Sequence, residues 1–115
     1  MKRVLVVDDH PAVALALKLY FKRDGRFEVA AGATTAAEGL RLLEGGFDAV
    51  LLDLNLPDAS GTELVRAFRD RAGETPLILY TATEDTAAVR GLVDAVAAKT
   101  DPADAVAALE RVCSA

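Results

Sequence analysis

The sequence predicts an α/β protein with a doubly wound, five-stranded parallel sheet, and two observations support that prediction. Short apolar runs alternate five times with longer stretches in which apolar residues recur at helical spacing. The composition is that of a folded domain, because 52% of the 115 residues are hydrophobic and 27% are charged. Alternation of this kind builds βαβ units, in which helices cover both faces of a parallel sheet.

Five short apolar segments are the predicted strands. VLVV and AVLL are continuously apolar, which is typical of central strands that are buried on both faces. In chain order, the predicted strands are residues 4–7, 27–33, 49–52, 77–80 and 95–98.

Five longer segments are the predicted helices, and most of them begin with a recognisable signal. Thr35 with Glu38, and Ser60 with Glu63, have the spacing of a capping box. Acidic residues suit the positive end of the fourth helix, and an Asp–Pro pair suits the start of the fifth. These residues are Glu84 and Asp85 for the fourth helix and Asp101 and Pro102 for the fifth. In chain order, the predicted helices cover residues 11–23, 34–46, 60–73, 83–92 and 101–112.

Length, charge and cysteine content narrow the class of protein. We expect a single domain spanning residues 1–115. The net charge of −5 weighs against a nucleic-acid-binding surface, and no apolar run approaches the ~20 residues that span a bilayer. The one cysteine, Cys113, cannot form an internal disulfide, so a cytoplasmic location is expected.

Polar side chains follow four of the predicted strands at the point where each strand ends. Asp8 and Asp9 follow the first strand, and Asp53 follows the third. Thr81 follows the fourth strand and Lys99 the fifth. Since ligands of open α/β sheets bind at the carboxyl ends of the strands, we expect these groups to converge there.

The residue types at this edge predict phosphoryl chemistry assisted by magnesium. Three clustered carboxylates repel one another, and a divalent cation relieves that repulsion. Oxygen ligands of this kind suit Mg²⁺. A carboxylate placed beside Mg²⁺ and an ammonium group can act as a nucleophile toward a phosphoryl group.

With these residues in this order, the chain resembles the receiver domain of two-component response regulators, whose CheY-like fold has the strand order 2-1-3-4-5. The resemblance covers essentially the whole chain. The residues on which it depends are the Asp8–Asp9 pair, Asp53 within DLNLPDASG, Thr81 followed by Ala82, and Lys99.

The resemblance implies a phosphorelay function. Asp53 would accept a phosphoryl group from a sensor histidine kinase or a histidine phosphotransfer protein. Lys99 would pair with that group, and Thr81 would move toward it. The domain would assist its own phosphorylation and dephosphorylation without being a turnover enzyme, and it could form a homodimer.

The resemblance also implies a set of metal ligands. Asp9 and Asp53 would bind Mg²⁺ directly together with the backbone carbonyl of Asn55, and Asp8 would act through a metal-bound water. His10 lies beside these acids, and we interpret it as a polar residue leading into the helix that starts at Pro11 rather than as a ligand.

One position departs from the family pattern. Receivers usually carry Tyr or Phe three residues before the lysine, whereas this chain has Val96. The stretch from Thr81 to Lys99 is also short for the family. A degenerate receiver that acts as a phosphorylation-independent interaction module is therefore the alternative hypothesis.

Two other classes of protein fit less well. An aspartyl-phosphate phosphatase would place a second Asp two residues after the first, where this chain has Asn55. A flavodoxin-like cofactor binder would need a phosphate-binding loop after the first strand, and the acidic DDHPA repels phosphate. The DDHP start resembles NarL/FixJ-type regulators, which carry a C-terminal helix-turn-helix domain. Two alternatives are open: a stand-alone receiver, or the receiver of a transcription factor whose DNA-binding domain would lie outside this chain. Neither nucleic acid nor membrane is expected to contact the domain itself.

Overall fold

The computed structural model describes residues 1–82 and 85–113, and its centre is a parallel sheet of five strands. The strand order is β2-β1-β3-β4-β5, as the sequence predicted. The strands are β1 (Lys2–Val7), β2 (Phe27–Ala33), β3 (Ala49–Leu52), β4 (Leu77–Thr81) and β5 (Ala95–Ala98).

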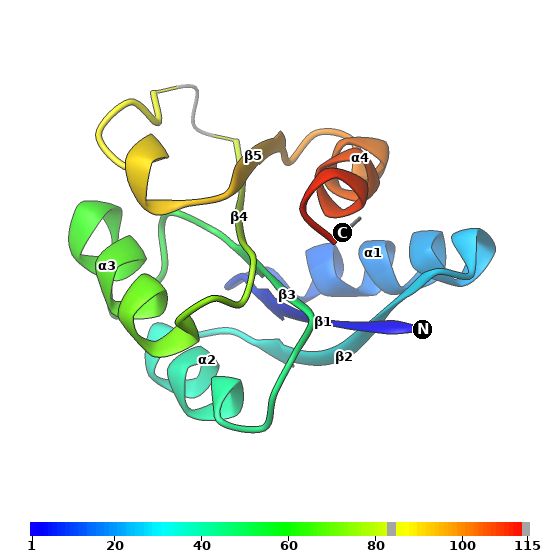
Figure 1. Ribbon diagram of the computed structural model, residues 1–115, viewed down its shortest axis with the longest axis horizontal. Helices are drawn as coiled ribbons and strands as arrows, with labels where there is room; N and C mark the ends of the chain where they lie inside the picture. The colour runs from blue at the N-terminus through cyan, green and yellow to red at the C-terminus, as the bar shows by residue number, and fades with distance from the viewer. Residues whose placement is uncertain (83–84, 114–115) are drawn as a thin grey trace.

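Helices cover the sheet on both sides, which confirms the doubly wound arrangement. Helices α1 and α4 lie together on one face, and α2 and α3 lie together on the other (Figure 1). Their bounds are Pro11–Asp24 for α1, Ala36–Leu43 for α2, Gly61–Ala72 for α3 and Pro102–Cys113 for α4.

The interior strand β1 is buried on both faces from Val4 to Val7. Val4 and Val6 belong to the core formed with α1 and α4, where they share a cluster with Phe21. Leu5 and Val7 point to the other side and belong to the core beneath α2 and α3. Each buried side chain of this size contributes roughly 1.5–3 kcal/mol, which explains why the buried stretch Val4–Val7 has no polar position.

The predicted helix caps are confirmed at two of three positions. The Thr35 hydroxyl accepts the N–H of Glu38 at 3.2 Å, and Asp101 accepts the N–H of Ala103 at 2.9 Å. The capping box at Ser60 is wrong, because Ser60 precedes α3 but its side chain makes no capping bond. Its backbone instead closes the β3–α3 loop through an antiparallel bridge with residue 55.

The predicted fourth helix is also wrong. Within the described part of residues 83–92, turns lead into a single 3₁₀ turn, η1 (Arg90–Leu92), and Glu84 lies outside the described residues. Only residues 82–94 connect β4 to β5. A crossover between parallel strands needs about a dozen residues merely to return, so this connection has no room for several α-helical turns.

Side-chain contacts fasten this short connection to the rest of the molecule. The guanidinium of Arg69 on α3 donates to the carbonyl of Leu92 at 3.4 Å and to the carboxylate of Asp94 at 3.0 Å. Asp94 also accepts the N–H of Leu77 at 2.8 Å. The segment that replaces the fourth helix is thereby tied to α3 and to the start of β4.

Candidate functional site

The backbone ladder places two of the acids at adjacent strand ends. The N–H of Asp8 donates to the carbonyl of Ala33 on β2 at 2.9 Å, and the N–H of Asp53 donates to the carbonyl of Val7 on β1 at 2.9 Å. Each acid therefore continues the sheet by one residue beyond its strand. Both side chains are held at the carboxyl edge that the sequence predicted.

Lys99 joins these two acids. Its Nζ lies 2.6 Å from Oδ2 of Asp8 and 3.1 Å from Oδ2 of Asp53. The residues Asp8 and Asp53 are 4% and 6% exposed, so both carboxylates have lost most of their contact with water. A buried charge needs a partner, and the ammonium group supplies it for both.

Opposing effects act on the pKa of Lys99. Burial is the largest, and it lowers the pKa because it disfavours the charged ammonium. The contacts with Asp8 and Asp53 together outweigh it, so the net pKa of Lys99 is raised above its ordinary value. The site therefore holds a protonated lysine at neutral pH.

Thr81 lies next to Lys99 through the sheet. It is the last residue of β4, is 4% exposed, and pairs with Ala98 on β5. Its carbonyl accepts the N–H of Lys99 at 3.1 Å. The predicted hydroxyl and ammonium residues thus come from neighbouring strand ends.

The acids fit a hard divalent cation. Asp8, Asp9, His10 and Asp53 each offer a ligand atom, and these atoms all lie within 4.8 Å of one another. The buried Oδ2 of Asp8 has no hydrogen-bond donor among the described residues, and its short contact with Lys99 is an ion pair without hydrogen-bond geometry. Carboxylate oxygens with unused acceptor capacity are what such a cation binds.

Asn55 follows Asp53 in the β3–α3 loop, and Val96 lies on β5 ahead of Lys99. The N–H of Asn55 points back to Oδ1 of Asp53 at 3.4 Å, and the residue is exposed in the β3–α3 loop. Val96 pairs with Leu79 and is partly buried against the core beneath α2 and α3. The position that usually carries an aromatic ring is therefore occupied by a small, packed side chain.

Sequence reasoning missed the role of Asp58. Its carboxylate accepts the backbone N–H of Ala36 at 2.8 Å and of Ala37 at 3.0 Å, so it caps α2 from the loop that follows Asp53. These hydrogen bonds hold the pKa of Asp58 below its ordinary value. Nothing in the local sequence relates residue 58 to residue 36, so only the fold could reveal this contact.

Replacing Asp58 with Ala is expected to lower the Tm at pH 7, with a difference from the parent that shrinks in acid. Because the pKa of Asp58 is depressed, its contribution is present above its ordinary value of about 3.9 and is lost as pH falls through the folded pKa. Thermal melts from pH 7 to pH 2.5 measure this. A constant difference across that range would show that the carboxylate charge is not involved.

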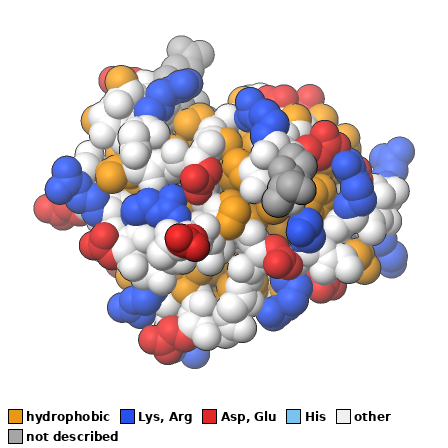
Figure 2. Space-filling model, in the orientation of Figure 1, with side chains coloured by type: hydrophobic (Ala, Val, Ile, Leu, Met, Phe, Trp, Pro, Cys, Tyr) orange, Lys and Arg blue, Asp and Glu red, His pale blue; other side chains and the backbone are white. Residues whose placement is uncertain are grey.

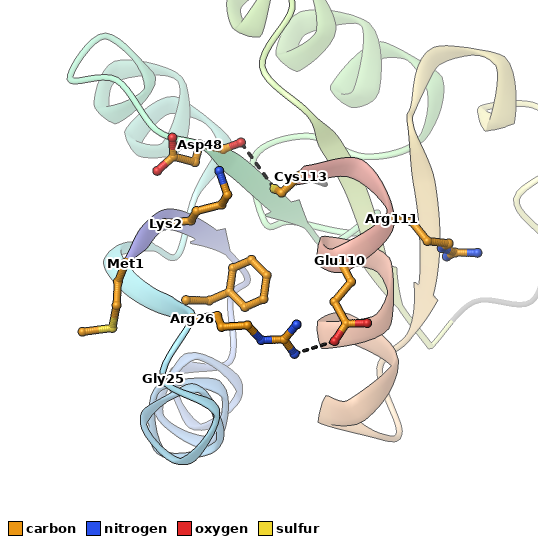
Figure 3. A pocket seen from close by; sticks show the side chains of 9 residues that line it. Met1, Lys2, Gly25, Arg26, Asp48, Glu110, Arg111 and Cys113 are labelled. Carbon is orange, nitrogen blue, oxygen red and sulfur yellow. Dashed lines mark hydrogen bonds and ion pairs between the residues drawn. The ribbon is translucent and has the colours of Figure 1, made fainter. Parts of the chain in front are cut away.

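A pocket at the opposite end of the molecule does not share this chemistry. It lies between the starts of β1 and β2 and the end of α4 (Figure 3). Arg26, one of the cations that line it, pairs with Asp24 and Glu110. The acids that lie close enough together to share one cation are at the carboxyl edge instead. In the described part of the chain, no helix is both long and apolar enough to cross a membrane.

An open parallel sheet that gathers three acids and a lysine at its carboxyl edge defines the CheY-like class of α/β modules. Comparison with known proteins agrees with that class. The family described as the response regulator receiver domain matches residues 4–110. The chain therefore belongs to the receiver domains of two-component response regulators, which are signalling modules.

Similar proteins include regulators of transcription. The nitrate/nitrite response regulator protein homolog of Haemophilus influenzae is 29% identical over 94 residues, which cover 81% of this chain and 45% of that protein. The TorCAD operon transcriptional regulatory protein TorR of Escherichia coli is 34% identical over 84 residues, or 71% of this chain and 35% of that protein. The chain thus spans less than half the length of these relatives.

A solved structure matches the whole fold. The LuxR-family two-component response regulator from Aurantimonas sp. SI85-9A1 superimposes with a TM-score of 0.86 at 30% sequence identity, covering 99% of this chain and 86% of that chain. The agreement extends over all five strands, so the short connection between β4 and β5 does not disturb the sheet.

Proposed function

We propose that Asp53 accepts a phosphoryl group in a two-component phosphorelay. The observation that supports this is the position of its buried carboxylate, 3.1 Å from the Lys99 ammonium and beside Asp8 and Asp9. In the transfer, a carboxylate oxygen of Asp53 bonds to phosphorus. The bond from phosphorus to the donor's imidazole nitrogen breaks, and that nitrogen keeps the electron pair.

The surrounding residues have distinct parts in this transfer. Asp9, Asp53 and the backbone carbonyl of Asn55 would hold a Mg²⁺ ion, and Asp8 would contact it through water. When bound, the ion supplies positive charge that stabilises the transferring phosphoryl group. Lys99, whose Nζ lies 3.1 Å from Oδ2 of Asp53, would supply a second positive charge. Thr81, at the end of β4, would donate a hydrogen bond to a phosphoryl oxygen.

A direct test separates this function from a phosphorylation-independent module. Incubation of the parent protein with acetyl phosphate and Mg²⁺ is expected to add one phosphoryl group, detected by intact mass, and EDTA should prevent it. If neither acetyl phosphate nor a phosphorylated histidine kinase adds a phosphoryl group, the interaction module is the better description.

The natural donor would be a histidine kinase or phosphotransfer protein that docks beside the site. Two large apolar side chains of α1, Leu15 and Leu19, are 58% and 60% exposed. They are four residues apart and so lie on one face of the helix, whose amino end adjoins Asp9. An exposed apolar pair of this kind fits the apolar face of a partner helix.

Replacing Leu15 and Leu19 together with Glu is expected to slow transfer from a phosphohistidine donor about tenfold or more, as loss of a central apolar contact does. Phosphorylation by acetyl phosphate should be unchanged because the site itself is intact. Ala107→Glu, at an exposed position of α4, is the matched control. Equal slowing with both donors would show that the leucines support the site rather than the partner.

The output of the switch would lie outside this chain. The matched stretches cover 45% of the Haemophilus influenzae response regulator and 35% of the transcriptional regulatory protein TorR, which supports a DNA-binding output domain elsewhere in the full protein. The receiver itself is a poor DNA surface. Its net charge is −5, and acidic and basic side chains are interspersed on the face shown in Figure 2.

A further inference from the structure

Tyr80 is a buried tyrosine next to the functional site. It precedes Thr81 on β4 and pairs with Ala97 on β5. Only 3% of the residue is exposed, and it packs in the core beneath α1 and α4, on the face of the sheet opposite to Val96. A tyrosine ring in an apolar core brings a hydroxyl with it, and a buried hydroxyl needs a hydrogen-bond partner.

The partner of this hydroxyl is the backbone of Lys99. The Tyr80 hydroxyl donates to the carbonyl oxygen of Lys99 at 3.5 Å, and the N–H of Lys99 donates to the carbonyl of Thr81 at 3.1 Å. Two successive residues of β4 therefore hold the two backbone polar groups of a single residue. That residue is the lysine whose Nζ contacts Asp8 and Asp53.

The Tyr80 hydroxyl remains a donor at neutral pH. Burial, followed by the negative charges of Asp101, Asp104 and Asp8, raises the pKa of Tyr80 to about 12. Asp104 belongs to the first turn of α4, so the hydroxyl lies where the chain leaves β5 and turns into that helix. The proton needed for the hydrogen bond to Lys99 is therefore always present under physiological conditions.

The direction of the Lys99 carbonyl matters because the chain reverses immediately after it. The N–H of Asp101 donates to the carbonyl of Ala98 at 3.4 Å, and the Asp101 side chain caps α4. A rotation of the peptide group that follows Lys99 would move its Cα and with it the base of the lysine side chain. The Tyr80 hydroxyl opposes this rotation because it holds the carbonyl in one direction.

We propose that Tyr80 is a positioning residue for phosphoryl transfer, because its hydroxyl holds the backbone of Lys99 and so keeps the ammonium beside the carboxylate of Asp53. This inference rests on the proposed acceptance of a phosphoryl group at Asp53. It adds a residue outside the acid cluster that does not touch the reacting atoms itself. Misplacement of a catalytic group by roughly 1 Å can cost about 100-fold in rate, so a small movement of Lys99 has a measurable effect.

Tyr80→Phe tests this role because it removes only the hydroxyl and keeps the ring in the core. Phosphorylation by acetyl phosphate at saturating Mg²⁺ is expected to slow by about 3- to 10-fold, the size of effect expected from one neutral hydrogen bond. Binding of Mg²⁺, measured by calorimetry, should weaken by less than about twofold because the carboxylates are unchanged. Tyr20→Phe is the matched control, since Tyr20 packs against the same core from α1 and should leave the rate unchanged.

A spectroscopic measurement locates the effect of the hydroxyl. In protein labelled with ¹³C and ¹⁵N, the carbonyl resonance of Lys99 and the amide nitrogen resonance of Thr100 belong to the peptide group that accepts this hydrogen bond. Both resonances should shift in Tyr80→Phe and stay in place in Tyr20→Phe. If the rate falls while these resonances stay in place, the hydroxyl acts elsewhere and the inference fails.

The outcomes distinguish this inference from the proposed function. A parent that is phosphorylated, with Tyr80→Phe matching its rate, would overturn the inference alone. Equal losses of rate and of Mg²⁺ affinity in Tyr80→Phe would show that the hydroxyl supports the whole site rather than Lys99, and would also overturn it. Failure of the parent to accept a phosphoryl group would overturn both.

Discussion

Replacing Lys99 with Met is expected to lower the free energy of unfolding by about 3 kcal/mol in metal-free buffer, the low end of the cost of breaking a buried ion pair. Methionine keeps the length of the side chain but removes the ammonium that contacts Asp8 and Asp53. The Lys99 side chain is only 14% exposed, so water cannot fully replace it. Urea unfolding of the parent and the variant measures the difference.

Two further measurements show whether the lost stability comes from the missing Lys99 ammonium group. Lys22→Met, at an exposed position of α1, should change stability by less than about 0.5 kcal/mol. Mg²⁺ should raise the Tm of Lys99→Met more than that of the parent, because the dication takes over the neutralisation of the acids. A variant as stable as the parent without metal would show that the ammonium does not stabilise the paired acids.

The pH dependence of this difference has a definite sign. Because the pKa of Lys99 is raised in the folded protein, its contribution is complete below the unfolded value of about 10.4. It is lost only as pH rises through the folded pKa. The stability gap between the parent and Lys99→Met should therefore persist through neutral pH and close in strong alkali.

Replacing Asp53 with Asn is expected to abolish the phosphoryl adduct completely. An amide nitrogen or oxygen is a far weaker nucleophile than a carboxylate, while the side chain keeps its shape and its place between β3 and Lys99. Intact mass after incubation with acetyl phosphate and Mg²⁺ measures the loss. Asp70→Asn, an exposed acid of α3, should be phosphorylated like the parent. An adduct that persists in Asp53→Asn would place the acceptor elsewhere.

The sheet could be predicted from sequence because its constraints are local. A strand buried on both faces has to be apolar at every position, as Val4 to Val7 and Ala49 to Leu52 are. Parallel strands in a doubly wound sheet also bring their carboxyl ends to one edge. The juxtaposition of Asp8, Asp53 and Lys99 follows from that topology.

What could not be predicted depends on contacts across the fold. Residues 83–92 have a helical pattern, but the connection is short, and its described residues 85–92 form turns and the 3₁₀ turn at Arg90–Leu92 instead of an α-helix. The cap that Asp58 places on α2 joins segments that are far apart in sequence. The ring of His10 contacts Asp8 and Asp9, whereas the sequence predicts only a polar residue that leads into α1.

Borohydride trapping tests the central claim most directly. Borohydride reduces an aspartyl phosphate to homoserine and leaves free aspartate unchanged, so peptide mass spectrometry can locate the phosphorylated residue. After incubation with acetyl phosphate and Mg²⁺, we predict homoserine at position 53, and EDTA should prevent its formation. Homoserine at Asp8, Asp9 or any other acid, with none at position 53, would contradict the assignment of Asp53 as the phosphoryl acceptor.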